Sequence, residues 1–313
     1  MLSIKENSMF RMLLLAGCAL GSALIAMPAQ AQKLDPTKPE DALEISKRVH
    51  CGIGDKPAVI YWTGRVYSRV IGEPDRHLFN GEGMNIRRCV TVTDPKRGTG
   101  FRIVSREVMF FTDPKTGVIL REWTNPWTDE KLEVVQIAND PVNQRPSFAH
   151  GPNGEPNPPM RLEQIGGWAL MPLEIPLFYT NPLAGDYQDY VGNKYQAMEI
   201  FDFAARADEL FDTRKPIVYP TVSWVRLSDW MPWMKMRGRQ GQIVFNAMGA
   251  KIKSYDDLPK SMKDEIVANY PEYASAPPLD DARPNATTWT VVKKRIDEER
   301  KAKGAAPSPA ERH

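Results

Sequence analysis

The sequence contains little cysteine, little histidine and no excess of charge of either sign. Its 313 residues include 3 Cys, 4 His, 41 basic residues and 39 acidic residues. His50, His77 and His150 do not stand at the spacings from cysteine or from another histidine that metal sites use, so we predict no metal site. The balanced charge leaves no basic stripe, which disfavours nucleic acid as a partner.

The motifs of several common enzyme classes are also missing. No glycine-rich phosphate loop follows a predicted strand, no G-x-G-x-x-G opens a helix, and no G-x-S-x-G elbow occurs. We therefore predict no nucleotide or other cofactor. An active site assembled from distant strands leaves no local motif, so these absences leave catalysis open.

The first 31 residues have the pattern of a cleavable export signal. Lys5 and Arg11 precede an apolar run over 12–27, and Ala29-Gln-Ala31 fits the site of a signal peptidase. We predict a periplasmic protein that begins at residue 32. The apolar run is shorter than the roughly 20 residues of a membrane-spanning helix, so no integral span is expected.

A second interpretation of this segment is lipid anchoring. Leu15-Ala-Gly-Cys18 resembles a lipoprotein cleavage box, which would place a lipid on Cys18. Cleavage there leaves only about six apolar residues after Arg11, short of the roughly 7–15 that a signal requires. Soluble export is therefore the favoured prediction.

The rest of the chain is expected to form one β-rich domain over 32–290 and a polar C-terminal tail over 291–313, helical or frayed. The 42% content of hydrophobic residues is sufficient for a core. Cys51 and Cys89 are a candidate disulfide pair in an oxidising compartment. Two separate buried thiols are the alternative, because sequence does not give the Cα–Cα distance that a bridge demands.

Runs rich in β-branched and aromatic residues predict an antiparallel β-fold. Strands are expected at 58–70, 101–111, 118–124, 131–138, 168–179, 195–203, 221–227 and 242–247, with helices at 39–49 and 258–269. The first four strands are joined by short turns and form a meander. About ten strands without βαβ spacing favour a lipocalin-like barrel or a strongly curved sheet, with one or two peripheral helices.

Glu107 is the strongest candidate for chemistry. Because side chains alternate along a strand, Glu107 shares a face with Ile103, Met109 and Phe111. A carboxyl group in such surroundings has a raised pKa and can act as a general acid or base. The alternative is an ion pair with an arginine of a neighbouring strand. Arg106 should face the other way, as a surface charge.

Tryptophans form a second group of candidates. Trp62 could line a pocket beside Gly64, or it could belong to the core. Trp224, Trp230 and Trp233 fall within thirteen residues that also contain Arg226 and three methionines. Such a segment suits an apolar ligand, a plug at the end of a barrel or, less well, a membrane surface.

Several segments together resemble a bacterial family catalogued as domain of unknown function eighteen thirty-eight. They are Trp62-Thr-Gly-Arg-Val-Tyr67, Ser105-Arg-Glu-Val108, Asp113-Pro-Lys-Thr-Gly117, Trp123-Thr-Asn-Pro126, Asn139-Asp-Pro-Val142 and Trp230-Met-Pro-Trp-Met234. The resemblance covers about residues 40–290. It implies one continuous domain with no boundary at 151–159, and it implies no catalytic residue.

Two classes of function follow from these residues. The first is a periplasmic carrier of an apolar small molecule, aromatic or terpenoid-like, bound by Trp62, Glu107, Trp224, Arg226, Trp230 and Trp233. The second is a cofactor-independent enzyme, an isomerase, lyase or hydrolase, that uses Glu107 with Asp140 or Glu199. Convergence of Glu107, Glu199, Asp140, Arg226 and Tyr195 would favour the enzyme, whereas one polar anchor in an apolar lining would favour the carrier.

Overall fold

The structure is a computed structural model that describes residues 33–304 except 55, 185–186, 188–191 and 237. The predicted signal, including Cys18, and the last nine residues lie outside this part. The described residues belong to one compact unit, Gln32–His313. Within them, no helix combines the length and the apolar character that are needed to cross a membrane.

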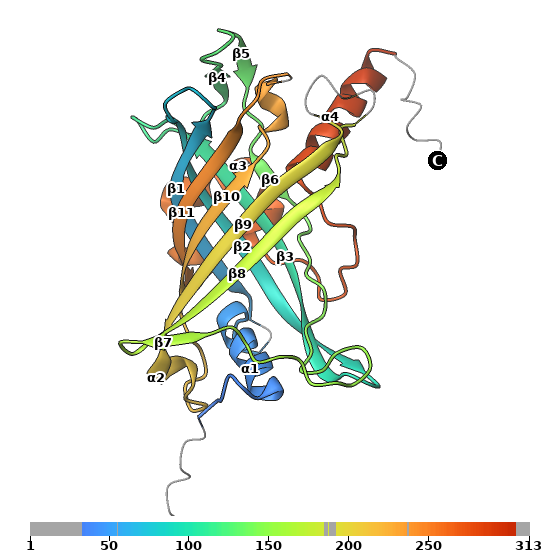
Figure 1. Ribbon diagram of the computed structural model, residues 1–313. Helices are drawn as coiled ribbons and strands as arrows, with labels where there is room; N and C mark the ends of the chain where they lie inside the picture. Colours follow the sequence, from blue (N-terminus) through green and yellow to red (C-terminus); the bar gives the residue numbers. More distant parts are fainter. Residues whose placement is uncertain (1–32, 55, 185–186, 188–191, 237, 305–313) are drawn as a thin grey trace, which may run out of the picture. The chain divides into compact units, whose positions relative to one another are not determined.

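A nine-stranded antiparallel sheet forms most of this unit (Figure 1). Its strand order is β6-β3-β2-β1-β11-β10-β9-β8-β7. The bounds are β1 Ala58–Arg69, β2 Arg76–Asp94, β3 Gly98–Thr112, β6 Ile137–Asn139, β7 Glu163–Ile165, β8 Trp168–Thr180, β9 Lys194–Arg206, β10 Thr221–Ser228 and β11 Gln242–Ile252. The prediction of a mainly antiparallel β-fold with few helices is confirmed.

The sheet curves so that distant strands share one inner face. Phe111 of β3 and Phe245 of β11 have ring centroids 6.3 Å apart. Three strand spacings separate β3 from β11, which is roughly 14 Å in a flat sheet. One apolar cluster accordingly combines these two side chains with Phe79 of β2 and Tyr195 of β9. β6 and β7 are the two edges, and the described strands show no pairing between them.

Strand β2 was not predicted, because glycines interrupt its apolar pattern. Gly81 and Gly83 lie on the inner face, where Gly83 is paired with Trp62 of β1. A Cβ added at Gly83 would lie 2.5 Å from the indole of Trp62. The glycine therefore makes room for a large ring on the adjacent strand, a use of glycine that a strand pattern based on β-branched residues does not detect.

The predicted strands at 118–124 and 131–138 are shorter than expected. Strands β4 (Glu122–Thr124) and β5 (Lys131–Glu133) form a separate two-stranded sheet, and only β6 joins the large sheet. Strand β9 extends past the strand predicted at 195–203 as far as Arg206, and the one-turn helix α2 (Ala207–Leu210) follows it directly.

Helices cover the ends and the outer face of the sheet. Helix α1 (Pro39–His50) places Ile45 and Val49 in an apolar cluster with residues of β1, β8, β9 and β10. Helix α3 (Lys260–Asn269) packs Met262 and Ile266 against Val108 of β3, on the outer face. The 3₁₀ helices are η2 (Pro232–Met234), η3 (Tyr255–Asp257) and η4 (Pro271–Ala274).

The C-terminal helix α4 (Thr288–Ala302) begins at a capping box formed by Thr287 and Thr290. Trp289, Val292 and Ile296 are buried in the large inner cluster. Residue 290 lies inside this helix, so the segment that follows it is helical, which is one of the two forms expected for it.

A disulfide joins Cys51, at the end of α1, to Cys89 of β2. Their Cα atoms are 5.6 Å apart, which lies within the range of protein disulfides. Of the two alternatives for these cysteines, the structure contains the bridge.

Candidate functional site

Polar side chains gather on the inner face of the curved sheet. Arg226 of β10 lies 3.4 Å from Glu199 of β9, measured from Nη1 to Oε1, and its Nη2 donates a hydrogen bond to the hydroxyl of Tyr195. Only about a sixth of the Arg226 and Glu199 side chains is exposed. Strand alternation places Glu107 of β3 on the same face, and its carboxyl group feels the charges of both residues.

Burial raises the pKa of Glu107. A hydrogen bond from Nδ2 of Asn139, 2.9 Å from Oε1, favours the ionised form, but repulsion from Glu199 adds to the effect of burial. Attraction to Arg226 and Arg87 opposes this rise and is weaker. The described residues give Glu107 no ion pair with an arginine, so it differs from the paired carboxylate that the sequence left as an alternative.

Arg226 is held in its protonated, cationic form. Burial lowers its pKa, but Glu199 and Tyr195 together raise it above the ordinary value. The guanidinium group nevertheless has an Nε that is buried without a hydrogen-bond partner in the described part of the chain. Arg226 therefore keeps one buried donor that the described residues leave unsatisfied.

Aromatic rings border this polar group. The indole of Trp224 lies in a T-shaped arrangement with Trp62, with ring centroids 6.1 Å apart, and stacks on Phe201 at 6.3 Å. All three side chains keep part of their surface exposed. The indole nitrogens of Trp62 and Trp224 have no hydrogen-bond partner among the described residues.

Trp230 and Trp233 lie at one end of the same apolar cluster and make no ring contact with Trp62 or Trp224. Trp233 packs against Phe79, Phe111 and Trp123, and both side chains are almost fully buried. The indole nitrogen of Trp230 donates to the carbonyl of Arg239. Trp230 and Trp233 are therefore part of the packed apolar core, apart from the ring pair formed by Trp62 and Trp224.

Asp140 does not join the polar group. It lies 3.2 Å from Arg106 and 2.8 Å from Arg283, measured between charged atoms. Asn139, its neighbour in sequence, is the residue that faces Glu107. Arg106 is buried, contrary to the expectation of a surface charge, because Asp140 and the carbonyl of Glu272 bind its guanidinium group.

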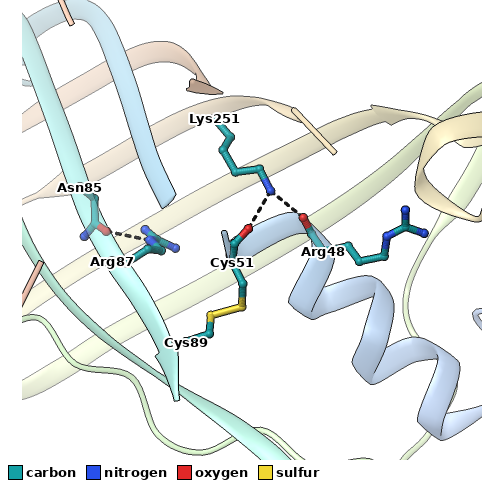
Figure 2. The surroundings of a disulfide bond; sticks show 6 residues. All are labelled: Arg48, Cys51, Asn85, Arg87, Cys89 and Lys251. Atoms are coloured by element: carbon teal, nitrogen blue, oxygen red, sulfur yellow. Dashed lines mark hydrogen bonds between the residues drawn. A yellow bond between two sulfur atoms is a disulfide. The ribbon is translucent and has the colours of Figure 1, made fainter. Parts of the chain in front are cut away.

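A group of cations lies on the inner face near the disulfide (Figure 2). The ammonium group of Lys251 of β11 donates to the carbonyls of Arg48 and Cys51, at 2.7 and 3.1 Å. Arg87 of β2 donates from Nε to Oδ1 of Asn85 at 2.7 Å. Arg87, Asn85 and Asn139 were not among the residues predicted from the sequence; the alternation of side chains along β2 would have placed the first two had that strand been predicted.

Desolvation changes the titration of this cationic group. Burial lowers the pKa of Lys251 to about 7, and repulsion from Arg87 and Arg48 contributes. Burial likewise lowers the pKa of Arg87 to about 10 and that of His50 to about 3. Each of these groups would therefore be stabilised as a cation by an added negative charge.

Two further features concern metal binding and pockets. No three His, Cys, Asp or Glu side chains within the described ranges are grouped so as to hold a metal ion. A pocket of about 490 Å³ is bordered by residues of the β4–β5 region together with Tyr270 and Arg295. Its arginines, Arg121 and Arg295, are paired with Glu265 and Glu133.

These observations define a mainly β protein whose curved sheet holds paired and unpaired polar side chains beside aromatic rings. The chain belongs to the family described as Protein of unknown function (DUF1838), whose model matches residues 55–296. This match confirms the resemblance seen in the sequence. A search of curated proteins finds no match.

Proposed function

We propose that the chain is an enzyme that transfers protons on a small apolar molecule bound at the inner face of the sheet, with Glu107 as its acid/base. The observation that carries this proposal is the convergence of Glu107, Glu199, Arg226 and Tyr195 on one face. Four polar groups exceed the single anchor expected of a carrier.

The two carboxyl groups suit different roles. Glu199 is held by Arg226 as an ion pair, whereas Glu107 has no such partner in the described chain and a pKa raised by burial. A carboxyl group of this kind can take a proton from one atom of a substrate and return it to another. Isomerisation by proton transfer needs no other reactant, so it is the simplest reaction that these residues support.

A carrier of an apolar small molecule is the second candidate. The observation in its favour is the wall formed by Trp62, Trp224 and Phe201, with two unpartnered indole nitrogens and partly exposed rings. In either case the curved sheet would act as the wall of a lipocalin-like barrel. We propose a periplasmic location for both, on the basis of the export signal.

Native mass spectrometry of protein purified from the periplasm tests the proposal. Wild-type protein should carry either no small molecule or the product of its reaction. Glu107→Gln keeps the size of the side chain and removes its charge, so this variant should carry unconverted substrate. The compound is then identified after denaturation and offered to both proteins.

Glu174→Gln is the matched control, because Glu174 lies on β8 in a partly exposed ion pair with Arg161. This variant should behave as the wild type does. If wild type and Glu107→Gln carry the same unchanged compound, the protein is a carrier. If neither wild type nor Glu107→Gln carries any small molecule, the inner face is not a ligand site.

A further inference from the structure

Two buried cations on the inner face have no carboxylate partner within the described residues. Arg87 and Lys251 are 8% and 3% exposed, and no ion pair joins either of them to a carboxylate of the described chain. Lys251 is satisfied in part by the carbonyls at the end of α1, whose helix dipole favours a cation there. The carboxyl group of Glu107 attracts Arg87 but forms no ion pair with it. A buried cation that is not directly paired is unfavourable, so an added anion would stabilise this part of the site.

The guanidinium group of Arg87 is oriented but only partly hydrogen-bonded, which suits binding of a ligand better than support of the fold. Its Nε is held by Asn85, and the described chain offers no hydrogen bond to its two terminal nitrogens. Asn85 thereby orients the guanidinium fork, whose terminal N–H groups match the two oxygens of a carboxylate. Arg48, by contrast, donates to four carbonyls at 209–215 and is committed to the fold.

The strand register places this fork in line with the rest of the site. Along β2, Gly83 is paired with Trp62, Asn85 is paired with Glu107, and Arg87 comes two residues later. Alternate residues of a strand are roughly 7 Å apart on one face. An aromatic surface, a carboxyl group and a cation therefore follow one another over a distance on the order of 13 Å.

We infer that Arg87, supported by Lys251, is the subsite for the anionic end of the ligand, and that the ligand is an apolar organic anion such as a carboxylate. The apolar body lies against Trp62 and Trp224, and the bond to be changed lies beside Glu107. The anionic group completes the charge balance that the described chain leaves open. This inference rests on the proposed site and names the class of its ligand.

Two fluorescent probes that differ by one anionic group test the inference. They are 8-anilinonaphthalene-1-sulfonate and the uncharged N-phenyl-1-naphthylamine, and binding is followed by quenching of tryptophan emission. Wild-type protein should bind the sulfonate about 10-fold or more tightly than the uncharged probe, because a charge-assisted fork contact contributes only to the former. This comparison needs no variant.

Arg87→Gln should lower the affinity for the sulfonate about 10-fold and leave the uncharged probe unchanged. Arg65→Gln, on the exposed outer face of β1, is the matched control and should change neither affinity. Circular dichroism shows whether each variant is folded, and Arg87→Lys provides a second test, since it keeps the charge and removes the fork.

The outcomes distinguish failure of the anionic subsite from failure of the whole inner-face site. Equal wild-type affinities for the two probes, or an equal loss of both in Arg87→Gln, overturn the anionic subsite and leave the inner-face site in place. If neither probe quenches tryptophan emission, both the subsite and the proposed site are wrong. A loss of sulfonate binding in Arg65→Gln shows adventitious surface binding and also overturns the inference.

Discussion

The carboxyl group of Glu107 links the packing of the sheet to its chemistry. Its folded-state pKa is raised by burial, so between the unfolded-state pKa of about 4.3 and the folded-state value the native protein binds more protons than the unfolded chain. The contribution of Glu107 to stability is therefore greatest at low pH and is lost as the pH rises through the folded-state pKa.

Glu107→Gln removes this pH-dependent term. Relative to wild type, we expect the variant to gain stability as the pH rises from 4 to 8, measured by urea unfolding at both values. Glu174→Gln supplies the comparison for a partly exposed carboxylate. A stability difference between wild type and Glu107→Gln that is the same at both pH values would contradict a raised pKa.

For single residues, the sequence predicted which face of a strand a side chain lies on, but not which residues that side chain contacts. Alternation within a long apolar strand placed Glu107 on the inner face, as the structure has it. Asp140 does not lie with Glu107, contrary to the prediction from the sequence, because it follows a strand of only three residues. In so short a strand a shift of one position exchanges the two faces. Asn139 therefore faces Glu107, whereas Asp140 pairs with Arg106 and Arg283.

Among the elements, α1 depends on its covalent link to β2. The disulfide closes a loop with a sequence separation of 38, which stabilises the fold by roughly 3–4 kcal/mol through the entropy of the unfolded chain. Cys51→Ser/Cys89→Ser should lower the free energy of unfolding by about this amount in urea titrations. Two alkylatable thiols in denatured, unreduced wild type would show that no bridge forms.

The pairing of β1 with β2 depends on the lack of a side chain at Gly83. Gly83→Ala would bring a Cβ to 2.5 Å from the indole of Trp62, so the ring has to move. We expect a loss of stability of about 1–3 kcal/mol and a shift of tryptophan emission. In a Trp62→Leu background, Gly83→Ala should cause a much smaller loss of stability. If the losses of stability from the two substitutions are fully additive, contact with the indole is not the cause.

The elements that sequence reasoning found are those with an uninterrupted pattern. Strands β1, β3 and β8–β11 are rich in apolar and β-branched residues, and α1 and α3 have clear helical signals. Strand β2 escaped notice because its inner face carries glycines and the polar residues Asn85 and Arg87. Those residues are there because of rings and charges on other strands, and such contacts are not visible in a local pattern.

For the whole molecule, the predicted export signal determines where the chain would work. We expect N-terminal sequencing of periplasmic protein to begin at Gln32, after the cleavage motif Ala29-Gln-Ala31. Detection of a lipid-modified N-terminus at Cys18 would contradict this prediction and would tether the protein to a membrane.

The curvature of the sheet is the property of the whole unit that makes the site. It brings Glu107 of β3 close enough to feel Glu199 of β9 and Arg226 of β10, although five strand spacings separate β3 from β9 in the sheet order. Sequence patterns favoured a barrel or a strongly curved sheet, but they could not show which inner residues meet across it, since this depends on register and twist.

The most direct test of the central claim is the titration of Glu107 by NMR of protein labelled with ¹³C at glutamate carboxyl groups. The Glu107 resonance is assigned by its loss in Glu107→Gln. We predict that the pKa of Glu107 lies above the ordinary value of about 4.3 and rises further when N-phenyl-1-naphthylamine occupies the inner face and displaces water. An ordinary pKa that the probe does not change would contradict this prediction.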